Sequence, residues 1–290
     1  MKETYFSTRL FCQLVCIVVC TVLSINTAVA QRVIKVLAIG NSFSEDAVEQ
    51  YLHELATASG HQLVIGNMYI GGCSLERHYN NSIKNTPDYR YCKITQDGKK
   101  TYTQKYTLEK ALADEQWDYV SLQQASHFSG QYATYQPFLN HLTAYLKTKL
   151  PGKTKLIWHQ TWAYQQDSKH NGFANYGRNQ QQMYNSIVTT TKQVKKAMRP
   201  HFIVPVGTAV QNARTSALGD TLTRDGYHLS WVLGRYIAAC TWYEKLFQAT
   251  VVGNSYAPSP LTPLEKNIAQ QAAHKAVRKP LKVSRMGGKK

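Results

Sequence analysis

The chain has 290 residues and carries 34 lysines and arginines against 17 aspartates and glutamates, which gives a formal net charge of +17 at pH 7. This length suits one large α/β domain with a complete hydrophobic core and does not require a second domain. A strong positive charge can indicate nucleic-acid binding, but no recognisable nucleic-acid-binding module accompanies it here. Attraction to acidic polysaccharide explains the charge as simply, and we expect no nucleic-acid partner.

The first 30 residues have the pattern of a secretory signal peptide. Lys2 and Arg9 lie in a basic start, the apolar run LFCQLVCIVVCTVLSI follows, and small residues end at Ala30, which predicts cleavage before Gln31. An uncleaved membrane anchor is the alternative, but the apolar run is shorter than the roughly 20 residues that a spanning helix needs. We therefore expect a periplasmic or extracellular protein without stable membrane insertion.

Hydrophobic periodicity in the rest of the chain predicts strands that alternate with helices. Strands are expected at 33–39, 62–70, 117–124 and 154–159, with a fifth that begins at 201. Amphipathic helices are expected at 45–59, 74–81, 106–114, 137–149, 179–198, 211–217 and 230–247. Residues 93–105 alternate around Asp97-Gly98, which predicts a hairpin inserted beside the sheet. The alternation implies a central parallel sheet with helices on both faces.

Short polar clusters follow four of these strands. They are Gly40-Asn41-Ser42, Gly71-Gly72, Gln123-Gln124 and His159-Gln160-Thr161-Trp162. In an open parallel sheet, ligands bind beyond the carboxyl ends of the strands. We therefore expect the functional site at this edge of the sheet.

Ser42 is the first residue to consider as a nucleophile. Turn chemistry and helix capping explain the polar cluster by themselves, and the nucleophile-elbow pattern Gly-x-Ser-x-Gly is incomplete because Ser44 stands at its last position. However, Asp225 and His228 stand as Asp-x-x-His in a polar loop before the last long helix. A serine hydroxyl needs a base to react, and a histidine oriented by a carboxylate supplies one.

This order of features resembles the SGNH, or GDSL-type, hydrolase superfamily over nearly all of the chain after residue 30. The family's Gly-Asp-Ser block corresponds to Gly40-Asn41-Ser42, which implies that Ser42 is the nucleophile. The family's Asp-x-x-His block corresponds to Asp225 as the orienting acid and His228 as the base. The resemblance implies a flavodoxin-like, three-layer α/β sandwich and a Ser-His-Asp triad that works without metal or organic cofactor.

The oxyanion hole departs from the family pattern. The second-block glycine is matched by Gly72, or less well by Gly71. The third block, Gly-x-Asn-Asp, is absent, and the equivalent strand ends at Gln123-Gln124. A glutamine amide carries the same donor group as the family's asparagine, and of the two we favour Gln124. The resemblance then implies an oxyanion hole from the N–H groups of Ser42 and Gly72 and one glutamine amide.

The substrate expected from these features is a carbohydrate ester or another small acyl ester. Residues 158–177 are aromatic and rich in amides, which suits sugar rings, although aromatic packing within a loop is an equal alternative. His159, Trp162 and Asn41 are the candidate substrate-binding residues, and His127 also follows a strand. No Cys-x-x-Cys motif and no His-x-x-x-His pair indicates a metal site. The leading interpretation is a secreted serine esterase that deacetylates or otherwise de-esterifies a carbohydrate.

Three other functions use the same features. The first is a glycan-binding protein on this fold that has lost its chemistry, and the second is an acyltransferase or thioesterase with the same triad. The third is an α/β-hydrolase proper, which we discount because its serine usually follows several strands and its acid lies far from its histidine.

The domain limits and the cysteines complete the expectations. The hydrolase-like domain should span 31–275, and the basic residues 276–290 should form a flexible, frayed extension. Cys73 and Cys92 either pair in an oxidising compartment or remain free, and Cys240 lies in an apolar helical pattern that predicts burial.

Overall fold

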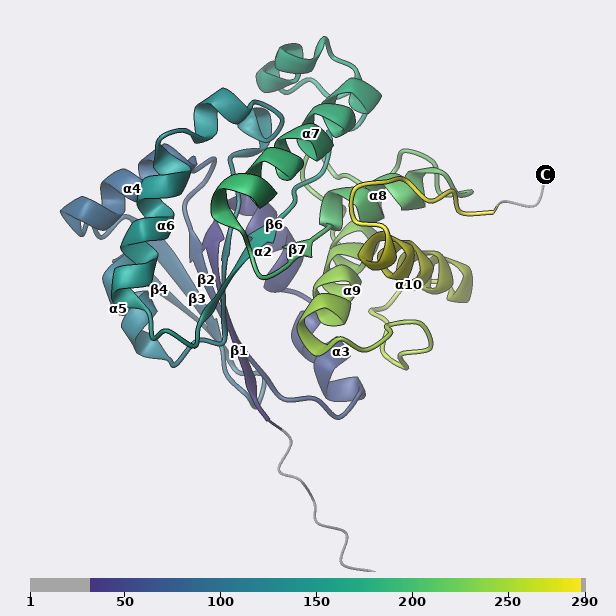
Figure 1. Ribbon diagram of the computed structural model, residues 1–290. Helices are drawn as coiled ribbons and strands as arrows, with labels where there is room; N and C mark the ends of the chain where they lie inside the picture. The colour runs from purple at the N-terminus through teal and green to yellow at the C-terminus, as the bar shows by residue number, and fades with distance from the viewer. Residues whose placement is uncertain (1–31, 288–290) are drawn as a thin grey trace, which may run out of the picture. The chain divides into compact units, whose positions relative to one another are not determined.

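A seven-stranded sheet forms the centre of the computed structural model, which describes residues 32–287 (Figure 1). Its order is β4-β3-β2-β1-β5-β6-β7. The strands are β1 Ile34–Gly40, β2 Leu63–Tyr69, β3 Tyr89–Ile94, β4 Lys100–Tyr106, β5 Tyr119–Leu122, β6 Lys155–His159 and β7 Ile203–Val204. Neighbours from β2 through β1, β5 and β6 to β7 pair in parallel. Among these parallel strands the order is the flavodoxin-like 2-1-3-4-5, so the predicted fold class is confirmed.

Helices cover both faces of the sheet and make three layers (Figure 1). They are α2 Ser42–Val48, α3 Leu52–Ala58, α4 Leu75–Lys84, α5 Leu108–Asp114, α6 Phe138–Lys149, α7 Gln180–Met198, α8 Val206–Arg214, α9 Leu233–Phe247 and α10 Pro263–Arg278. The core on one face includes side chains of α2, α3, α8, α9 and α10, and the core on the other includes those of α4, α5 and α6, while α7 contributes to both.

The packing of β1 explains why its sequence is an almost continuous apolar run. Val36 and Ala38 enter one core, and Leu37 and Ile39 enter the other. Successive side chains of a strand point to opposite faces, so a strand covered on both faces must be apolar at every position.

Two expected elements have different limits in the structure. The helix expected over 45–59 is divided into α2 and α3, because Tyr51 between them has φ 64, in the left-handed region. The fifth strand ends at Val204, and α8 begins at Val206 instead of residue 211. Pro205 stands between them and has no N–H to continue the strand ladder.

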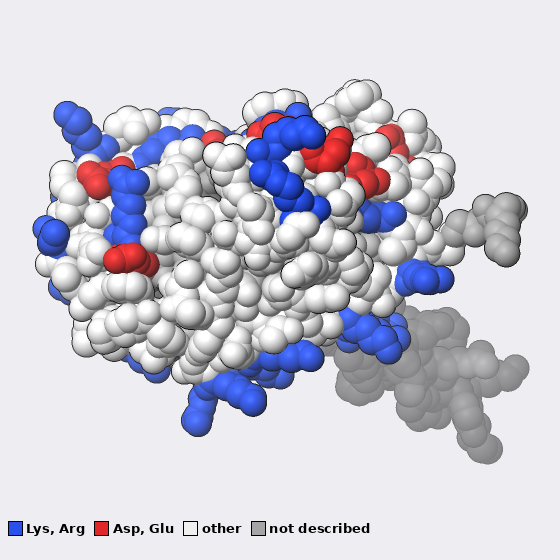
Figure 2. Space-filling model, turned by 90° about the horizontal axis from the view of Figure 1, so that it is seen from above, with Lys and Arg blue, Asp and Glu red and all other residues white. Residues whose placement is uncertain are grey.

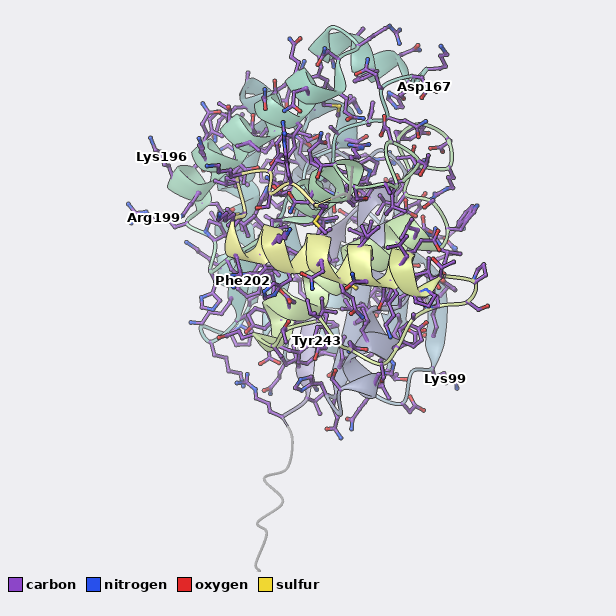
Figure 3. All side chains as sticks on the ribbon, turned by 90° about the vertical axis from the view of Figure 1, so that its right-hand side faces the viewer. Lys99, Asp167, Lys196, Arg199, Phe202 and Tyr243 are labelled. Atoms are coloured by element: carbon purple, nitrogen blue, oxygen red, sulfur yellow. The ribbon has the colours of Figure 1, made fainter. Side chains whose placement is uncertain are left out.

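The hairpin expected around Asp97-Gly98 is present but forms part of the sheet. Strand β3 pairs antiparallel with both β4 and β2, so the hairpin extends the sheet at its edge. Figure 3 shows the hairpin turn at Lys99 far below Asp167, which lies in the loop after β6. The turn is therefore remote from the carboxyl ends of the parallel strands.

Helix α10 lies over α9 and α8 on the side seen in Figure 3. It begins with a capping box between Thr262 and Glu265, and it buries Ile268, Ala272 and Ala276. No helix was expected over these residues, although apolar residues four apart are a helix signal.

The segment after α10 is also bound to the domain, which corrects the expectation of a frayed tail. The Thr208 hydroxyl donates to the Pro280 carbonyl at 2.6 Å, and the Ser284 N–H donates to the Asn212 side chain at 2.6 Å. Met286 is 8% exposed, and its N–H donates to the Thr215 hydroxyl at 2.8 Å, just after α8. The domain therefore extends past residue 275.

The cysteines within the described residues are free thiols. Cys73, Cys92 and Cys240 are all buried, so the disulfide alternative is not formed. Burial raises the pKa of Cys73 and of Cys92 to about 12, which keeps both thiols protonated and unreactive at neutral pH. The predicted signal peptide, residues 1–30, lies outside the described residues, and within 32–287 no helix is long and apolar enough to cross a bilayer.

Removing residues 279–290 should lower the free energy of unfolding by roughly 2–4 kcal/mol, because three hydrogen bonds and the burial of Met286 are lost. Urea unfolding measures the change, with a variant that lacks only 288–290 as the control. Equal stability of the two truncated proteins would contradict the bound arrangement.

Candidate active site

Ser42 is the first residue of α2 and directly follows β1 by way of Asn41. The Asn41 side chain accepts from the Phe43 N–H at 3.0 Å and so caps the helix. Gly40 is required before it, because a Cβ there would lie 2.6 Å from the Ser44 hydroxyl oxygen. The turn thus places Ser42 at the carboxyl end of β1, between β2 and β5, where the strand order reverses.

Ser42, His228 and Asp225 form a continuous line of hydrogen bonds. The Ser42 Oγ lies 2.8 Å from His228 Nε2, and His228 Nδ1 lies 2.6 Å from Asp225 Oδ2. The other carboxylate oxygen, Oδ1, accepts the N–H groups of His228 at 2.8 Å and Tyr227 at 3.2 Å.

These contacts set the charge of Asp225. Partial burial favours the neutral acid, but hydrogen bonds from the His228 ring and from two backbone N–H groups outweigh it and hold the pKa of Asp225 below its usual value. The carboxylate is therefore ionised at neutral pH and receives the Nδ1–H of His228. Nε2 is then left as the acceptor that faces the serine hydroxyl.

A chain of buried hydrogen bonds joins the strand ends around Ser42. His159 Nδ1 lies 2.7 Å from Gln123 Oε1, Gln123 Nε2 donates to Asn41 Oδ1 at 2.8 Å, and Asn41 Nδ2 donates to the Cys73 carbonyl at 3.0 Å. Burial lowers the pKa of His159 to about 3, so its ring is neutral and donates to Gln123. The ends of β6, β5 and β1 and the turn after β2 are thereby held together.

The two glutamines point in opposite directions, as adjacent residues at a strand end should. Gln124 Nε2 donates to the Thr134 carbonyl at 3.1 Å and hydroxyl at 3.3 Å, while its Oε1 accepts from the Leu75 N–H at 2.9 Å. Its amide is therefore occupied in holding α4 and the loop after β5. The structure does not bring the favoured Gln124 to Ser42, and Gln123 is the glutamine that reaches Asn41.

Gly72 lies in the exposed turn after β2 with φ +61, a conformation that L side chains rarely adopt. Gly71 beside it has no such requirement, and a Cβ there would meet only the Tyr69 hydroxyl at 3.5 Å. The bond from Asn41 to the carbonyl of Cys73 ties this turn to the serine loop.

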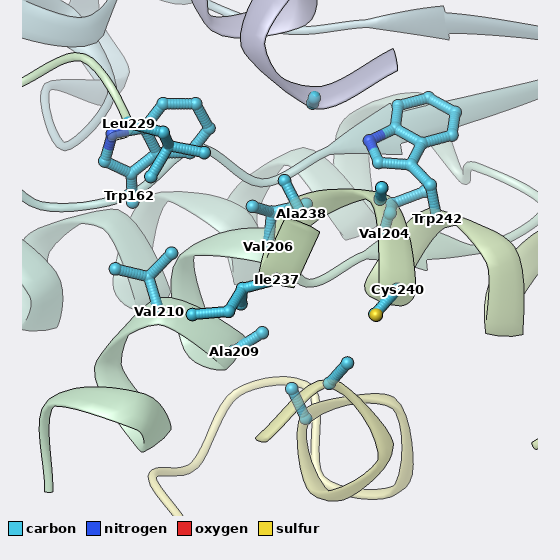
Figure 4. Close-up of a cluster of buried hydrophobic side chains, with 14 of the residues drawn as sticks. Trp162, Val204, Val206, Ala209, Val210, Leu229, Ile237, Ala238, Cys240 and Trp242 are labelled. Atoms are coloured by element: carbon cyan, nitrogen blue, oxygen red, sulfur yellow. The ribbon is translucent and has the colours of Figure 1, made fainter. Parts of the chain in front are cut away.

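The three residues expected to bind substrate are buried. Asn41 is 1% exposed, and His159 and Trp162 are 0% exposed. Trp162 stacks on Phe43 with ring centroids 3.9 Å apart, and Figure 4 shows it among the core side chains. Polar and aromatic residues at the ends of a sheet that is covered on both faces can pack into the core as readily as they face solvent. These three side chains therefore pack below the site and do not form a surface for substrate.

Other aromatic side chains are half-exposed beside the triad. The ring of Tyr227 lies 4.0 Å from that of His228, His170 lies 4.7 Å from Tyr227, and His127 lies 6.1 Å from His170. Burial lowers the pKa of both His127 and His170, which favours neutral rings. Of these residues, only His127 was expected near the site. His170 lies in the aromatic loop 158–177, and Tyr227 lies in the Asp-Gly-Tyr-His segment, but neither was singled out from the sequence.

Figure 2 looks down on the carboxyl edge of the parallel strands. It shows a broad area without lysine, arginine, aspartate or glutamate, with most charged side chains toward its margin. The positive charge of the chain is therefore not concentrated on this edge.

Among the described residues, no group of three or more histidines, cysteines, aspartates or glutamates stands together as metal ligands.

Asn41→Asp should lower the free energy of unfolding by about 1–3 kcal/mol, because the donor to the buried Cys73 carbonyl is lost. Urea unfolding measures the change. The same substitution at the exposed Asn140 serves as the control and should have little effect. An unchanged stability of Asn41→Asp would contradict the hydrogen-bond chain.

Comparisons with known proteins agree with this architecture. A family model described as "Domain of unknown function (DUF4886)" matches residues 35–276. The crystal structure of a DUF4886 family protein from Bacteroides uniformis is 53% identical, covers 88% of this chain and 98% of its own, and superimposes with a TM-score of 0.87. A protein from Slackia heliotrinireducens, described as a candidate SGNH hydrolase, is 21% identical over 73% of this chain and 98% of its own, with a TM-score of 0.50. No curated protein matches. The chain therefore belongs to the DUF4886 family and has the fold of the SGNH hydrolases.

Proposed function

We propose that the protein is a serine esterase in which Ser42, His228 and Asp225 form the catalytic triad. The observation that carries the proposal is the line of hydrogen bonds from Ser42 Oγ to His228 Nε2, 2.8 Å, and from His228 Nδ1 to Asp225, 2.6 Å. A nucleophile and its base within hydrogen-bond reach, with a third group that orients the base, is the arrangement that nucleophilic catalysis requires. The SGNH hydrolase fold supports a hydrolase function.

The reaction proceeds by acyl transfer. Ser42 Oγ bonds to the ester carbonyl carbon while its proton passes to His228 Nε2, and the carbonyl oxygen becomes an oxyanion. His228 then gives this proton to the leaving alcohol oxygen as the carbon–oxygen bond breaks, which leaves the acyl group on Ser42. A water attacks the acyl-enzyme, its proton passes through His228 to Ser42 Oγ, and the carboxylic acid departs. Asp225 stays ionised and stabilises the imidazolium.

The oxyanion is held by the N–H groups of Ser42 and Gly72 and by the amide of Gln123. We assign the amide donor to Gln123 instead of Gln124, because Gln123 is the glutamine that contacts the serine loop. Its Nε2 carries two hydrogens, and Asn41 receives one of them.

The substrate class is a carbohydrate ester, with acetyl as the first acyl group to test. Half-exposed, neutral aromatic rings continue from His228 through Tyr227 and His170 to His127. Neutral aromatic faces suit an uncharged sugar better than an anionic one. Export through the predicted signal peptide would bring the enzyme to extracellular polysaccharide.

Hydrolysis of p-nitrophenyl acetate by residues 31–290 tests the triad. The wild-type protein should turn over, while folded Ser42→Ala and His228→Ala variants should lose about 10³-fold or more in kcat. Activity that persists in Ser42→Ala would contradict the assigned nucleophile. If all three proteins are equally inactive on acetylated glycans as well, the glycan-binding alternative replaces the esterase.

A panel of acyl esters tests the substrate class. Acetylated polysaccharides should be deacetylated with a higher kcat/KM than long-chain acyl esters of p-nitrophenol. Activity on the long-chain esters alone would contradict a carbohydrate substrate. Product analysis with an added alcohol acceptor separates hydrolysis from acyl transfer.

Gly72→Ala should lower kcat by about 10²-fold, because a side chain strains the φ of +61 and displaces an oxyanion donor. Gly71→Ala is the matched control and should keep nearly full activity, since its Cβ makes only ordinary contact with a tyrosine hydroxyl. The opposite result would assign the donor to Gly71.

A further inference from the structure

Asp46 lies one turn after Ser42 on α2 and is 0% exposed. Its carboxylate receives three separate groups from the second half of the chain. Arg224 Nη1 lies 3.0 and 3.1 Å from its two oxygens, Arg235 Nε and Nη2 lie 2.8 and 2.7 Å from Oδ1, and the Leu229 N–H donates to Oδ2 at 2.9 Å. A fully buried carboxylate with two arginines and a backbone donor is a rigid junction.

The junction holds both ends of the loop that carries the acid and the base. Arg224 immediately precedes Asp225, and Leu229 immediately follows His228. The loop is also closed on itself, because the Arg224 N–H donates to the His228 carbonyl at 3.0 Å. Asp46 thus fastens this loop to the helix that carries the nucleophile.

The arginines are also fixed from their other sides. The Arg224 and Arg235 guanidinium carbons lie 4.1 and 4.3 Å from the centroid of the Trp231 ring, at cation–π distance. Arg235 belongs to α9, so the junction joins α2, the catalytic loop and α9.

Burial of a charged carboxylate adds little net stability to a fold, because its desolvation opposes the gain from ion pairing. Desolvation raises the pKa of Asp46, and the charges of Arg235 and Arg224 only partly offset it. Apolar side chains of similar volume often stabilise a protein as well as a buried ion pair does. What the ion pairs add is a fixed geometry between the two segments they join.

We propose that Asp46 is a positioning residue that sets the separation between Ser42 Oγ and His228 Nε2. The inference rests on the proposed triad. Without the carboxylate, the loop of Asp225 and His228 is free to move relative to α2, and a displacement of about 1 Å can lower a rate by about 10²-fold.

Glu49 offers a matched control at the end of the same helix. It is 1% exposed and accepts from Arg90 Nη2 at 2.9 Å and from Asn67 Nδ2 at 2.6 Å. It is thus also a buried carboxylate paired with an arginine. However, these partners lie on β3 and β2, and a further donor, the Tyr102 hydroxyl at 3.3 Å, lies on β4, so none belongs to the catalytic loop.

The experiment compares Asp46→Asn with Glu49→Gln in residues 31–290. Both variants should lose stability in urea unfolding. Asp46→Asn should lower kcat for p-nitrophenyl acetate by about 10²-fold with little change in KM, and Glu49→Gln should keep kcat within about threefold. Equal kcat losses in the two folded variants would overturn the inference. If Asp46→Asn does not fold, Arg224→Lys replaces it, with the same expected split between kcat and KM.

Crystal structures of the two variants separate this inference from the proposed function. The Ser42 Oγ to His228 Nε2 contact should open beyond 3.5 Å in Asp46→Asn and stay closed in Glu49→Gln. That result supports the positioning role even if the wild-type protein proves inactive as an esterase. A contact that stays at 2.8 Å in Asp46→Asn would overturn it.

Discussion

The site depends on a chain of buried hydrogen bonds at the point where the order of the parallel strands reverses. There β1 lies between β2 and β5, and polar side chains fill the space beyond the strand ends. Gln123 bonds to both His159 and Asn41, and Asn41 bonds to the Cys73 carbonyl, so the side-chain amides of Gln123 and Asn41 both have partners. The serine loop is therefore held from two sides before any substrate arrives, by Gln123 after β5 and by Cys73 after β2.

The second requirement is that two distant parts of the sequence meet in one geometry. In the proposed triad, Ser42 stands on α2, while Asp225 and His228 stand in the loop before α9. Asp225 is exposed to 40% in its side chain and depends on hydrogen bonds from its own loop, whereas Asp46 is buried and binds across the two segments. In our proposal, the exposed carboxylate of Asp225 orients the base, and the buried carboxylate of Asp46 orients the loop. Asp225 and Asp46 are thus the same residue type in opposite environments, one exposed and one buried.

The order of elements and the meeting of Ser42, Asp225 and His228 could be predicted from the sequence. A serine after the first strand and an Asp-x-x-His before the last long helix depend only on order along the chain. The direction of side chains at strand ends could not. Gln123 and Gln124 differ only in which face they meet, and that depends on the packing of α4 against the sheet. Trp162 suited a sugar-binding surface by type, yet it stacks on Phe43 in the core. Similarly, the basic composition after residue 275 concealed the contacts that bind the segment after α10 to the domain.

The most direct test of the proposed triad is to trap its nucleophile covalently. The protein, residues 31–290, is incubated with a serine-reactive fluorophosphonate, and the adduct is located by mass spectrometry of its peptides. If His228 activates Ser42, a single adduct forms on Ser42. This adduct should be absent after heat denaturation and strongly reduced in His228→Ala. An adduct on another residue, or no adduct in the folded wild-type protein, would contradict an activated Ser42.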